Sequence, residues 1–217
     1  METINLKKLL LIGDSIRLGY DKAIKKTLEG KAEVYFPEEN CRFTSYILRR
    51  ALNWKEEMNC GDDVDLVHFN AGLWDDLVLL DGKHLTPINV YQENLQRICD
   101  TLRILFPCAK LIFATSTPVR ESLFLGPIKR YNRDTEMFNA AARKVMEKNN
   151  CEINDLYAAV SGCDESFYSD MTHLYTECGT DLMAKKVVQT IENALHIKAK
   201  EIDFKAAFRK VKGIEGF

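Results

Sequence analysis

The chain has 217 residues, of which 46% are apolar and 29% are charged, and its formal net charge is −2. This length and composition predict one globular α/β domain with a substantial core. The near-neutral charge argues against a general nucleic-acid binder or a protein drawn to anionic membranes. No apolar run reaches the length of a membrane span, and no signal-peptide pattern is visible at the N-terminus.

Seven cysteines are spread from Cys41 to Cys178 without any C-x-x-C pair. Their odd number and scattered spacing argue against a disulfide framework and against a zinc site. We therefore expect a protein of the reducing cytoplasm. The histidines and cysteines also lack metal-ligand spacing, so we expect neither a metal nor another cofactor.

Taken in chain order, short apolar runs alternate with stretches of helical periodicity. The first strand is expected at 6–12, followed by a helix to about residue 28, and later strands at 32–36, 64–69, 110–115 and 152–156. The intervening helices are marked by four apolar stripes: Ile47, Leu48, Ala51 and Leu52; Tyr91, Leu95, Ile98, Leu102 and Leu105; Met137, Phe138, Ala141 and Val145; Met183, Val187, Val188, Ile191 and Leu195. This alternation predicts a three-layer α/β/α domain with a five-stranded parallel sheet.

The domain is expected to occupy residues 1–197. Residues 198–217 form a basic amphipathic tail with Phe204, Phe208 and Val211 on its apolar side. Such a tail is expected to pack on its own domain or on a second copy of the chain in a homodimer, and membrane binding is a less favoured alternative.

The end of the first strand carries Gly13-Asp14-Ser15. This arrangement places a hydroxyl at the carboxyl edge of the sheet, where open α/β sheets bind their ligands. The following helix N-terminus favours a developing negative charge. Taken alone, the tripeptide also fits a simple turn in which Asp14 or Ser15 caps the helix.

A second motif lies near the other end of the chain, where Asp170 precedes His173 by three residues. An aspartate at this spacing can hold one imidazole nitrogen and leave the other to act as a general base. An isolated D-x-x-H is more often an aspartate capping a turn beside a surface histidine. The remaining histidines are weaker candidates for a base: His68 inside a strand, His84 in a polar loop and His196 at a helix end.

The stretch Leu10-Leu11-Ile12-Gly13-Asp14-Ser15-Ile16, together with Asp170-Met171-Thr172-His173, resembles the SGNH (GDSL) hydrolases over nearly the whole chain. No G-x-S-x-G motif is present, so an α/β-hydrolase elbow is not supported. The resemblance implies a flavodoxin-like sheet, with Ser15 as nucleophile, His173 as base and Asp170 as the residue that orients it.

In that family the oxyanion hole comes from the serine N–H, a glycine N–H after the second strand and an asparagine side chain after the third. Here Cys41 occupies the glycine position and could still supply a backbone N–H. Tryptophan replaces the usual asparagine in Gly72-Leu73-Trp74-Asp75, so Asn70 is the preferred amide donor and the indole N–H of Trp74 is the alternative. The simpler alternatives are that Cys41 is a packing residue and that Asn70 satisfies loop backbone groups.

The resemblance therefore implies ester hydrolysis through an acyl-enzyme. Asp14, Arg42 and Trp74 are expected beside the substrate, where an aromatic and polar rim suits a carbohydrate. Deacetylation of a sugar or similar small ester is the preferred hypothesis. A lysophospholipase or thioesterase on the same fold, and a non-catalytic α/β binding module, are the alternatives.

Overall fold

The computed structural model describes residues 6–200 and contains a single five-stranded sheet. Its strands are β1 (Lys7–Ile12), β2 (Ala32–Tyr35), β3 (Leu66–Phe69), β4 (Lys110–Ala114) and β5 (Glu152–Asn154). All neighbouring strands are parallel, in the order β2-β1-β3-β4-β5. This is the flavodoxin-like order, so the predicted fold class is confirmed.

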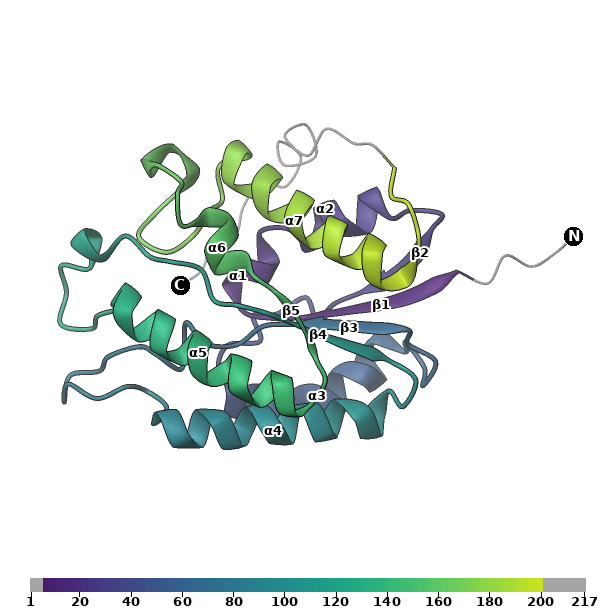
Figure 1. Cartoon of the computed structure of the whole chain (residues 1–217), viewed down its shortest axis with the longest axis horizontal. Helices are drawn as coiled ribbons and strands as arrows, with labels where there is room; N and C mark the ends of the chain where they lie inside the picture. Colours follow the sequence, from purple (N-terminus) through teal and green to yellow (C-terminus); the bar gives the residue numbers. More distant parts are fainter. Residues whose placement is uncertain (1–5, 201–217) are drawn as a thin grey trace, which may run out of the picture.

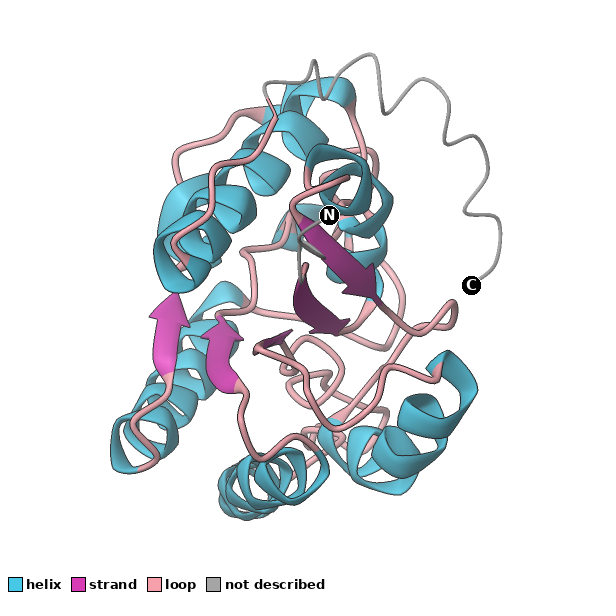
Figure 2. Ribbon diagram, turned by 90° about the vertical axis from the view of Figure 1, so that its right-hand side faces the viewer, coloured by secondary structure: helices cyan, strands magenta, loops and turns pink. Residues whose placement is uncertain are grey.

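Helices cover both faces of the sheet and produce three layers (Figures 1 and 2). One face carries α1 (Ser15–Leu18), α2 (Asp21–Thr27), α6 (Leu156–Val160) and α7 (Glu177–Leu195). The other face carries α3 (Thr44–Met58), α4 (Ile88–Leu105) and α5 (Asn132–Lys148). Two 3₁₀ turns, η1 (Glu121–Leu123) and η2 (Glu165–Phe167), lie in the connections.

The core lies in two halves because successive side chains of a strand point to opposite faces. In β1, Leu9 and Leu11 pack toward α2 and α7, whereas Leu10 and Ile12 pack toward α3 and α4. All four are almost fully buried. A strand covered on both faces needs this kind of continuous apolar run, which is why the run was recognisable in the sequence.

The structure corrects several sequence predictions. The first helix is split into α1 and α2 at Gly19, where an added Cβ would lie only 2.7 Å from the ring of Tyr175. Leu52 is 53% exposed and Met137 is 41% exposed, so neither belongs to the core face of its helix. The short helix α6 was not predicted. By contrast, the whole predicted stripe of α7 is buried.

The described part of the chain ends just after the predicted domain limit at residue 197. The N–H of Ala199 donates to Glu192 Oε1 of α7, and the N–H of Lys200 donates to the carbonyl of Thr27 at 3.1 Å. Residues 201–217 lie outside the described residues, so the packing of the predicted tail stays a prediction. Between residues 6 and 200, no helix is long and apolar enough to cross a membrane.

Candidate active site

Ser15, His173 and Asp170 form a continuous chain of polar contacts at the carboxyl edge of the sheet. Ser15 Oγ lies 2.8 Å from His173 Nε2, and His173 Nδ1 lies 2.7 Å from Asp170 Oδ2. Ser15 and His173 are each only 5% exposed. An imidazole placed between a serine hydroxyl and a carboxylate can accept the serine proton and is held in the correct tautomer to do so.

Local backbone geometry fixes the carboxylate of this chain. Asp170 Oδ1 accepts hydrogen bonds from the N–H groups of Thr172 at 2.7 Å and His173 at 2.8 Å. Partial burial opposes ionisation of Asp170, but the hydrogen bonds from the His173 ring and the two N–H groups outweigh it and lower its pKa to about 2. Asp170 is therefore a carboxylate at neutral pH, able to stabilise an imidazolium.

Tyr175 is a further component that the sequence analysis missed. Its ring stacks on the His173 ring with a centroid distance of 4.6 Å and an interplanar angle of 21°, and its hydroxyl donates to the carbonyl of Ser15. One side chain thus contacts both ends of the Ser15–His173 pair. An aromatic residue two positions after the histidine was the available signal in the sequence.

The structure contradicts the expectation that Asp14 contacts substrate. Asp14 is fully buried, and its Oδ1 accepts hydrogen bonds from Ile16 N at 2.9 Å and from Asn70 Nδ2 at 3.0 Å. Burial raises the pKa of this carboxyl, against the opposing effect of the Asn70 hydrogen bond. Asp14 is therefore the N-cap of α1 and an anchor for Asn70.

Asn70 directly follows β3 and lies against the glycine that precedes Asp14. A Cβ added to Gly13 would lie 1.9 Å from Asn70 Oδ1, so only glycine permits this close approach. The amide nitrogen of Asn70 carries two N–H groups, of which Asp14 engages one. The alternative that Asn70 satisfies loop backbone groups receives no support, because its hydrogen bond goes to a carboxyl.

The prediction that Cys41 supplies an oxyanion donor is contradicted. Its N–H donates to the carbonyl of Gly13 at 3.1 Å and is therefore already engaged. The left-handed backbone that favours glycine occurs one residue later, at Arg42, with φ of 52°. Cys41 is fully buried, and this burial raises the pKa of its thiol to about 11. Cys41 therefore fits the simpler alternative, in which it is a buried packing residue.

The two other predicted substrate contacts lie on separate loops. Arg42 is exposed, and its guanidinium lies 5.0 Å from the ring centre of Tyr46. Trp74 is half-buried in the loop that follows Asn70. No hydrogen bond or cation–π contact joins Arg42 to Trp74 in the described residues, and their approach to a substrate stays a prediction.

The loop that carries Trp74 is anchored by groups the sequence did not indicate. Arg130 donates from Nε to the carbonyl of Leu73, and that nitrogen lies 3.7 Å from Asp76 Oδ1. Asp75 accepts from the hydroxyl of Thr44 at 2.6 Å. Burial raises the pKa of Asp75 to about 6 and that of Asp76 to about 7. The loop is therefore held by two buried carboxyl groups whose pKa values lie near neutrality.

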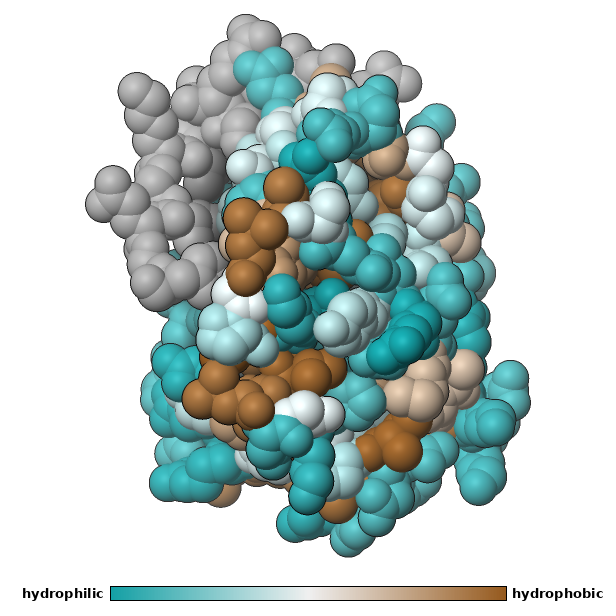
Figure 3. Space-filling model, turned by 90° about the vertical axis from the view of Figure 1, so that its left-hand side faces the viewer, coloured by the Kyte–Doolittle hydropathy of each residue, from teal (hydrophilic) through white to brown (hydrophobic). Residues whose placement is uncertain are grey.

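Three loops at the same edge are joined by backbone hydrogen bonds. Val78 and Lys129 exchange two such bonds, of 2.9 and 3.0 Å, and Arg120 N donates to Met171 O at 2.8 Å. Figure 3 looks onto this edge and shows apolar patches among polar residues. The exposed apolar side chains on these loops are Leu80, Leu123, Leu125, Ile128 and Met171.

The other histidines have partners elsewhere. His68 is buried in β3 as predicted, with Nε2 3.0 Å from Asn154 Nδ2, and burial lowers its pKa to about 4. His84 Nε2 lies 3.2 Å from Asp134 Oδ2. His196 forms the C-cap of α7. None of these three is in contact with Ser15 within the described residues.

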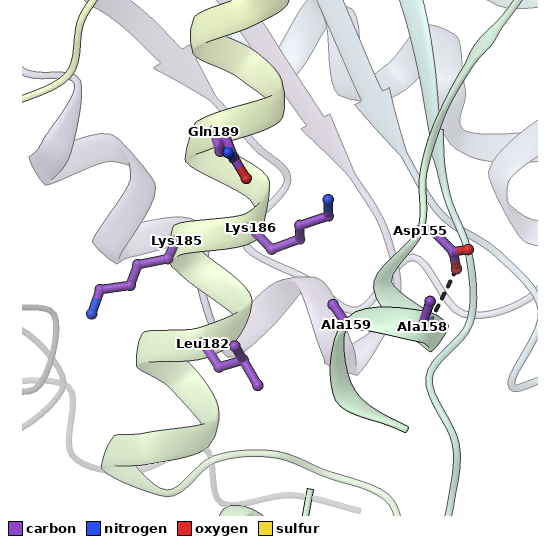
Figure 4. Close-up of a pocket in the computed structure, with 7 residues that line it drawn as sticks. All are labelled: Asp155, Ala158, Ala159, Leu182, Lys185, Lys186 and Gln189. Atoms are coloured by element: carbon purple, nitrogen blue, oxygen red, sulfur yellow. Dashed lines mark hydrogen bonds between the residues drawn. The ribbon is translucent and has the colours of Figure 1, made fainter. Parts of the chain in front are cut away.

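An open groove of about 700 Å³ lies between α6 and α7 (Figure 4). In the figure, Lys186 extends from α7 toward Asp155 at the start of α6. The groove contains none of the three residues of the serine–histidine–aspartate chain. Its lining residues are Asp155, Ala158, Ala159, Leu182, Lys185, Lys186 and Gln189.

Comparison with known proteins identifies the fold. The chain superposes on a lipase/acylhydrolase from Enterococcus faecalis with a TM-score of 0.70 and 21% identity, over 91% of this chain and 100% of that one. It superposes on the acetyl xylan esterase AlAXEase with a TM-score of 0.65 and 19% identity, over 85% and 99%. These matches confirm, at the level of the fold, the resemblance to the SGNH hydrolases.

In sequence, the chain is 25% identical over 138 residues to the GDSL esterase/lipase WDL1 of Oryza sativa subsp. japonica. That match covers 57% of this chain and 52% of the rice protein, so it spans about half the length of its relative. No protein-family model matches the chain.

Proposed function

We propose that this chain, which has the fold of the SGNH hydrolases, is a serine esterase that hydrolyses carboxylic esters through an acyl-enzyme. The observation that carries the proposal is the unbroken Ser15–His173–Asp170 contact chain, with heavy-atom distances of 2.8 and 2.7 Å. These distances lie within the range needed for proton transfer from nucleophile to base.

In the proposed mechanism Ser15 Oγ attacks the ester carbonyl carbon while His173 Nε2 takes the serine proton. Asp170 stabilises the imidazolium that forms. The carbonyl oxygen becomes an oxyanion, which accepts hydrogen bonds from the backbone N–H of Ser15 and from the side-chain amide of Asn70. His173 then protonates the leaving alcohol, and a water molecule releases the acid by the reverse sequence.

Only two oxyanion donors remain in this proposal, because the Cys41 N–H is engaged by Gly13. The Ser15 N–H is available because the first residue of a helix has no intrahelical acceptor for its N–H. Asn70 is oriented toward this region through its bond to Asp14, the neighbour of Ser15. A two-donor hole places more of the oxyanion stabilisation on Asn70 than a three-donor hole would.

For the substrate we propose a small acetyl ester, with an acetylated carbohydrate as the preferred class. The half-buried indole of Trp74 supports this choice, since aromatic faces stack on sugar rings. The cation–π pair of Arg42 and Tyr46 adds a polar aromatic surface near the start of α3. The similarity to an acetyl xylan esterase also supports it.

Esters with longer acyl chains are a second candidate substrate class. The exposed apolar side chains on the three joined loops favour it, particularly Leu125 at 88% exposed and Leu80 at 78% exposed. A series of p-nitrophenyl esters from acetate to decanoate separates the two classes. A maximum of kcat/KM at acetate supports an acetylesterase, and a maximum at long chains supports a lysophospholipase or thioesterase.

The test of the reaction class is labelling with a fluorophosphonate probe, combined with hydrolysis of p-nitrophenyl acetate. The native protein should be labelled and active, and Ser15→Ala should lose both properties. Ser116→Ala is the matched control, because Ser116 is another buried serine at the carboxyl edge of the sheet. A native protein with neither labelling nor hydrolysis would instead be a non-catalytic binding module.

We further propose a cytoplasmic location, which the odd number and scattered spacing of the seven cysteines support. Subcellular fractionation of a tagged chain tests it. Recovery in a secreted or envelope fraction would contradict it.

A further inference from the structure

Two cysteines that are far apart in the sequence lie in contact on the face of the sheet that α3, α4 and α5 cover. Cys99 belongs to α4, and Cys151 directly precedes β5. Their sulfur atoms are 4.0 Å apart, although 52 positions separate them in the chain. Since a disulfide bond is about 2.05 Å long, the two sulfurs would need to approach by only about 2 Å.

The surroundings of the two thiols differ in a way that assigns each a role. Cys99 is fully buried, whereas Cys151 is 8% exposed. The contact between the two thiols lowers the pKa of Cys151 and raises the pKa of Cys99. The residue with the slightly greater exposure is therefore also the one whose thiol ionises more readily.

A guanidinium lies near the pair and acts to lower the pKa of both thiols. Arg103 Nη1 donates to Asn149 Oδ1 at 2.7 Å, and its Nη2 donates to the Asn149 carbonyl. The Cys151 thiol donates to that same carbonyl at 3.6 Å, so Arg103 and Cys151 share one acceptor and the positive charge is held near the thiol. A cation near a thiol favours the thiolate that reacts with an oxidant, and a second cysteine in contact can resolve the oxidised sulfur.

We propose that Cys99 and Cys151 form an oxidation site that takes hydrogen peroxide and closes a reversible disulfide. The Cys151 thiol loses its proton and the thiolate attacks one peroxide oxygen, the O–O bond breaks, and a sulfenic acid and hydroxide form, and the hydroxide takes up the released proton to become water. Cys99 then attacks the sulfenic sulfur, the S–O bond breaks, and a second water leaves. In total, two thiols and one peroxide give one disulfide and two waters.

The bond would join α4 to the amino end of β5. Ser15 and its partners lie at the carboxyl ends of the strands, which is the opposite edge of the sheet. Closure of a loop of about 50 residues restricts the unfolded chain and raises stability. Oxidation should therefore raise the melting temperature and leave ester hydrolysis unchanged, so this proposal stands independently of the proposed function.

The direct test is peptide mass mapping of the native protein after brief exposure to hydrogen peroxide and alkylation of remaining thiols. The expected product is a peptide pair linked through Cys99 and Cys151. Cys108→Ser should still give it, because Cys108 is an exposed cysteine elsewhere. Recovery of Cys99 as the alkylated thiol, with Cys151 either alkylated or overoxidised, would overturn the proposal.

Two further measurements test the role of Cys151 in the disulfide and the role of Arg103 in its formation. The oxidised native protein should melt several degrees higher than the reduced one, reversibly with dithiothreitol, and Cys151→Ser should show no such rise. Arg103→Gln should slow disulfide formation by several-fold, whereas Arg97→Gln, an exposed arginine on the same helix, should not. Equal rates in the two arginine variants would remove Arg103 from the site.

Discussion

Asp14 Oδ1 lies 3.0 Å from Asn70 Nδ2, so the end of β1 is bonded directly to the end of β3. These two strand ends carry the candidate nucleophile and the candidate oxyanion donor. The bond uses a buried carboxyl and one of the two amide N–H groups of Asn70. The position of the second amide N–H is therefore set before any substrate arrives, which is the preorganisation that oxyanion stabilisation requires.

Replacing Asn70 by alanine is expected to lower kcat by about 10²–10³-fold with little change in KM, because the amide acts on the oxyanion and not on the bound ester. Steady-state hydrolysis of p-nitrophenyl acetate measures both constants. Gly13→Ala should cause a similar loss, since its Cβ would displace the Asn70 amide. Gly126→Ala is the control, because a Cβ there has no neighbour within 4 Å. Unchanged kcat in Asn70→Ala would exclude the amide from the hole.

Replacing Asp170 by asparagine is expected to lower kcat by roughly 10³–10⁴-fold, because the imidazole loses both its orientation and its counter-charge. The rate of fluorophosphonate labelling should fall in parallel. Asp164→Asn serves as control, since Asp164 caps a surface turn through Ser166. Labelling at the native rate in Asp170→Asn would show that His173 needs no carboxylate partner.

The two contacts of Tyr175 can be separated by two substitutions. Tyr175→Phe keeps the ring that stacks on His173 and removes only the hydrogen bond to the Ser15 carbonyl, so stability should fall by about 1 kcal/mol and activity by less than tenfold. Tyr175→Ala also frees the imidazole and should cost at least about tenfold more activity. Equal activities in the two variants would mean that the stacked ring does not position His173.

The pKa of buried Asp76 predicts how stability changes with pH. Its value is raised from 3.8 to about 7, so the folded state binds a proton that the unfolded state has already lost between these pH values. The contribution of Asp76 to stability must then fall as pH rises from about 4 to about 7 and level off above, whereas that of His68, whose pKa is lowered to about 4, rises over part of the same range. Each pKa unit corresponds to about 1.4 kcal/mol, so the total fall is on the order of a few kcal/mol.

Asp76→Asn should remove this contribution, because asparagine carries no charge to bury, so the variant should gain stability at pH 8 relative to pH 5 compared with the native protein. Urea unfolding at pH 5 and pH 8 measures the difference. The exposed Asp81→Asn is the control and should keep the native slope. A native slope in Asp76→Asn would assign the effect to another group, of which Asp75, with a pKa of about 6, is the nearest in the chain.

The order of strands and helices was predictable because each element leaves a pattern within its own segment of the sequence. A buried parallel strand needs a continuous apolar run, and a helix on its surface needs an apolar stripe, so both leave periodic patterns within a single segment. These patterns located five strands to within two residues at their ends, and they identified the buried face of α7. Ser15, His173 and Asp170 were selected by two short motifs, and the structure brings the three side chains together.

Tertiary structure alone decided which donors and acceptors meet. The sequence placed Cys41 at an oxyanion position, but its N–H is engaged by the Gly13 carbonyl once β1 and the segment after β2 come together. The same holds for the bond of Asp14 to Asn70 and for the contact of Cys99 with Cys151. Each of these contacts joins segments that are distant in the sequence. Whether a donor meets one acceptor or another, or two sulfurs meet, depends on distances in space, which the periodic pattern of the sequence does not show.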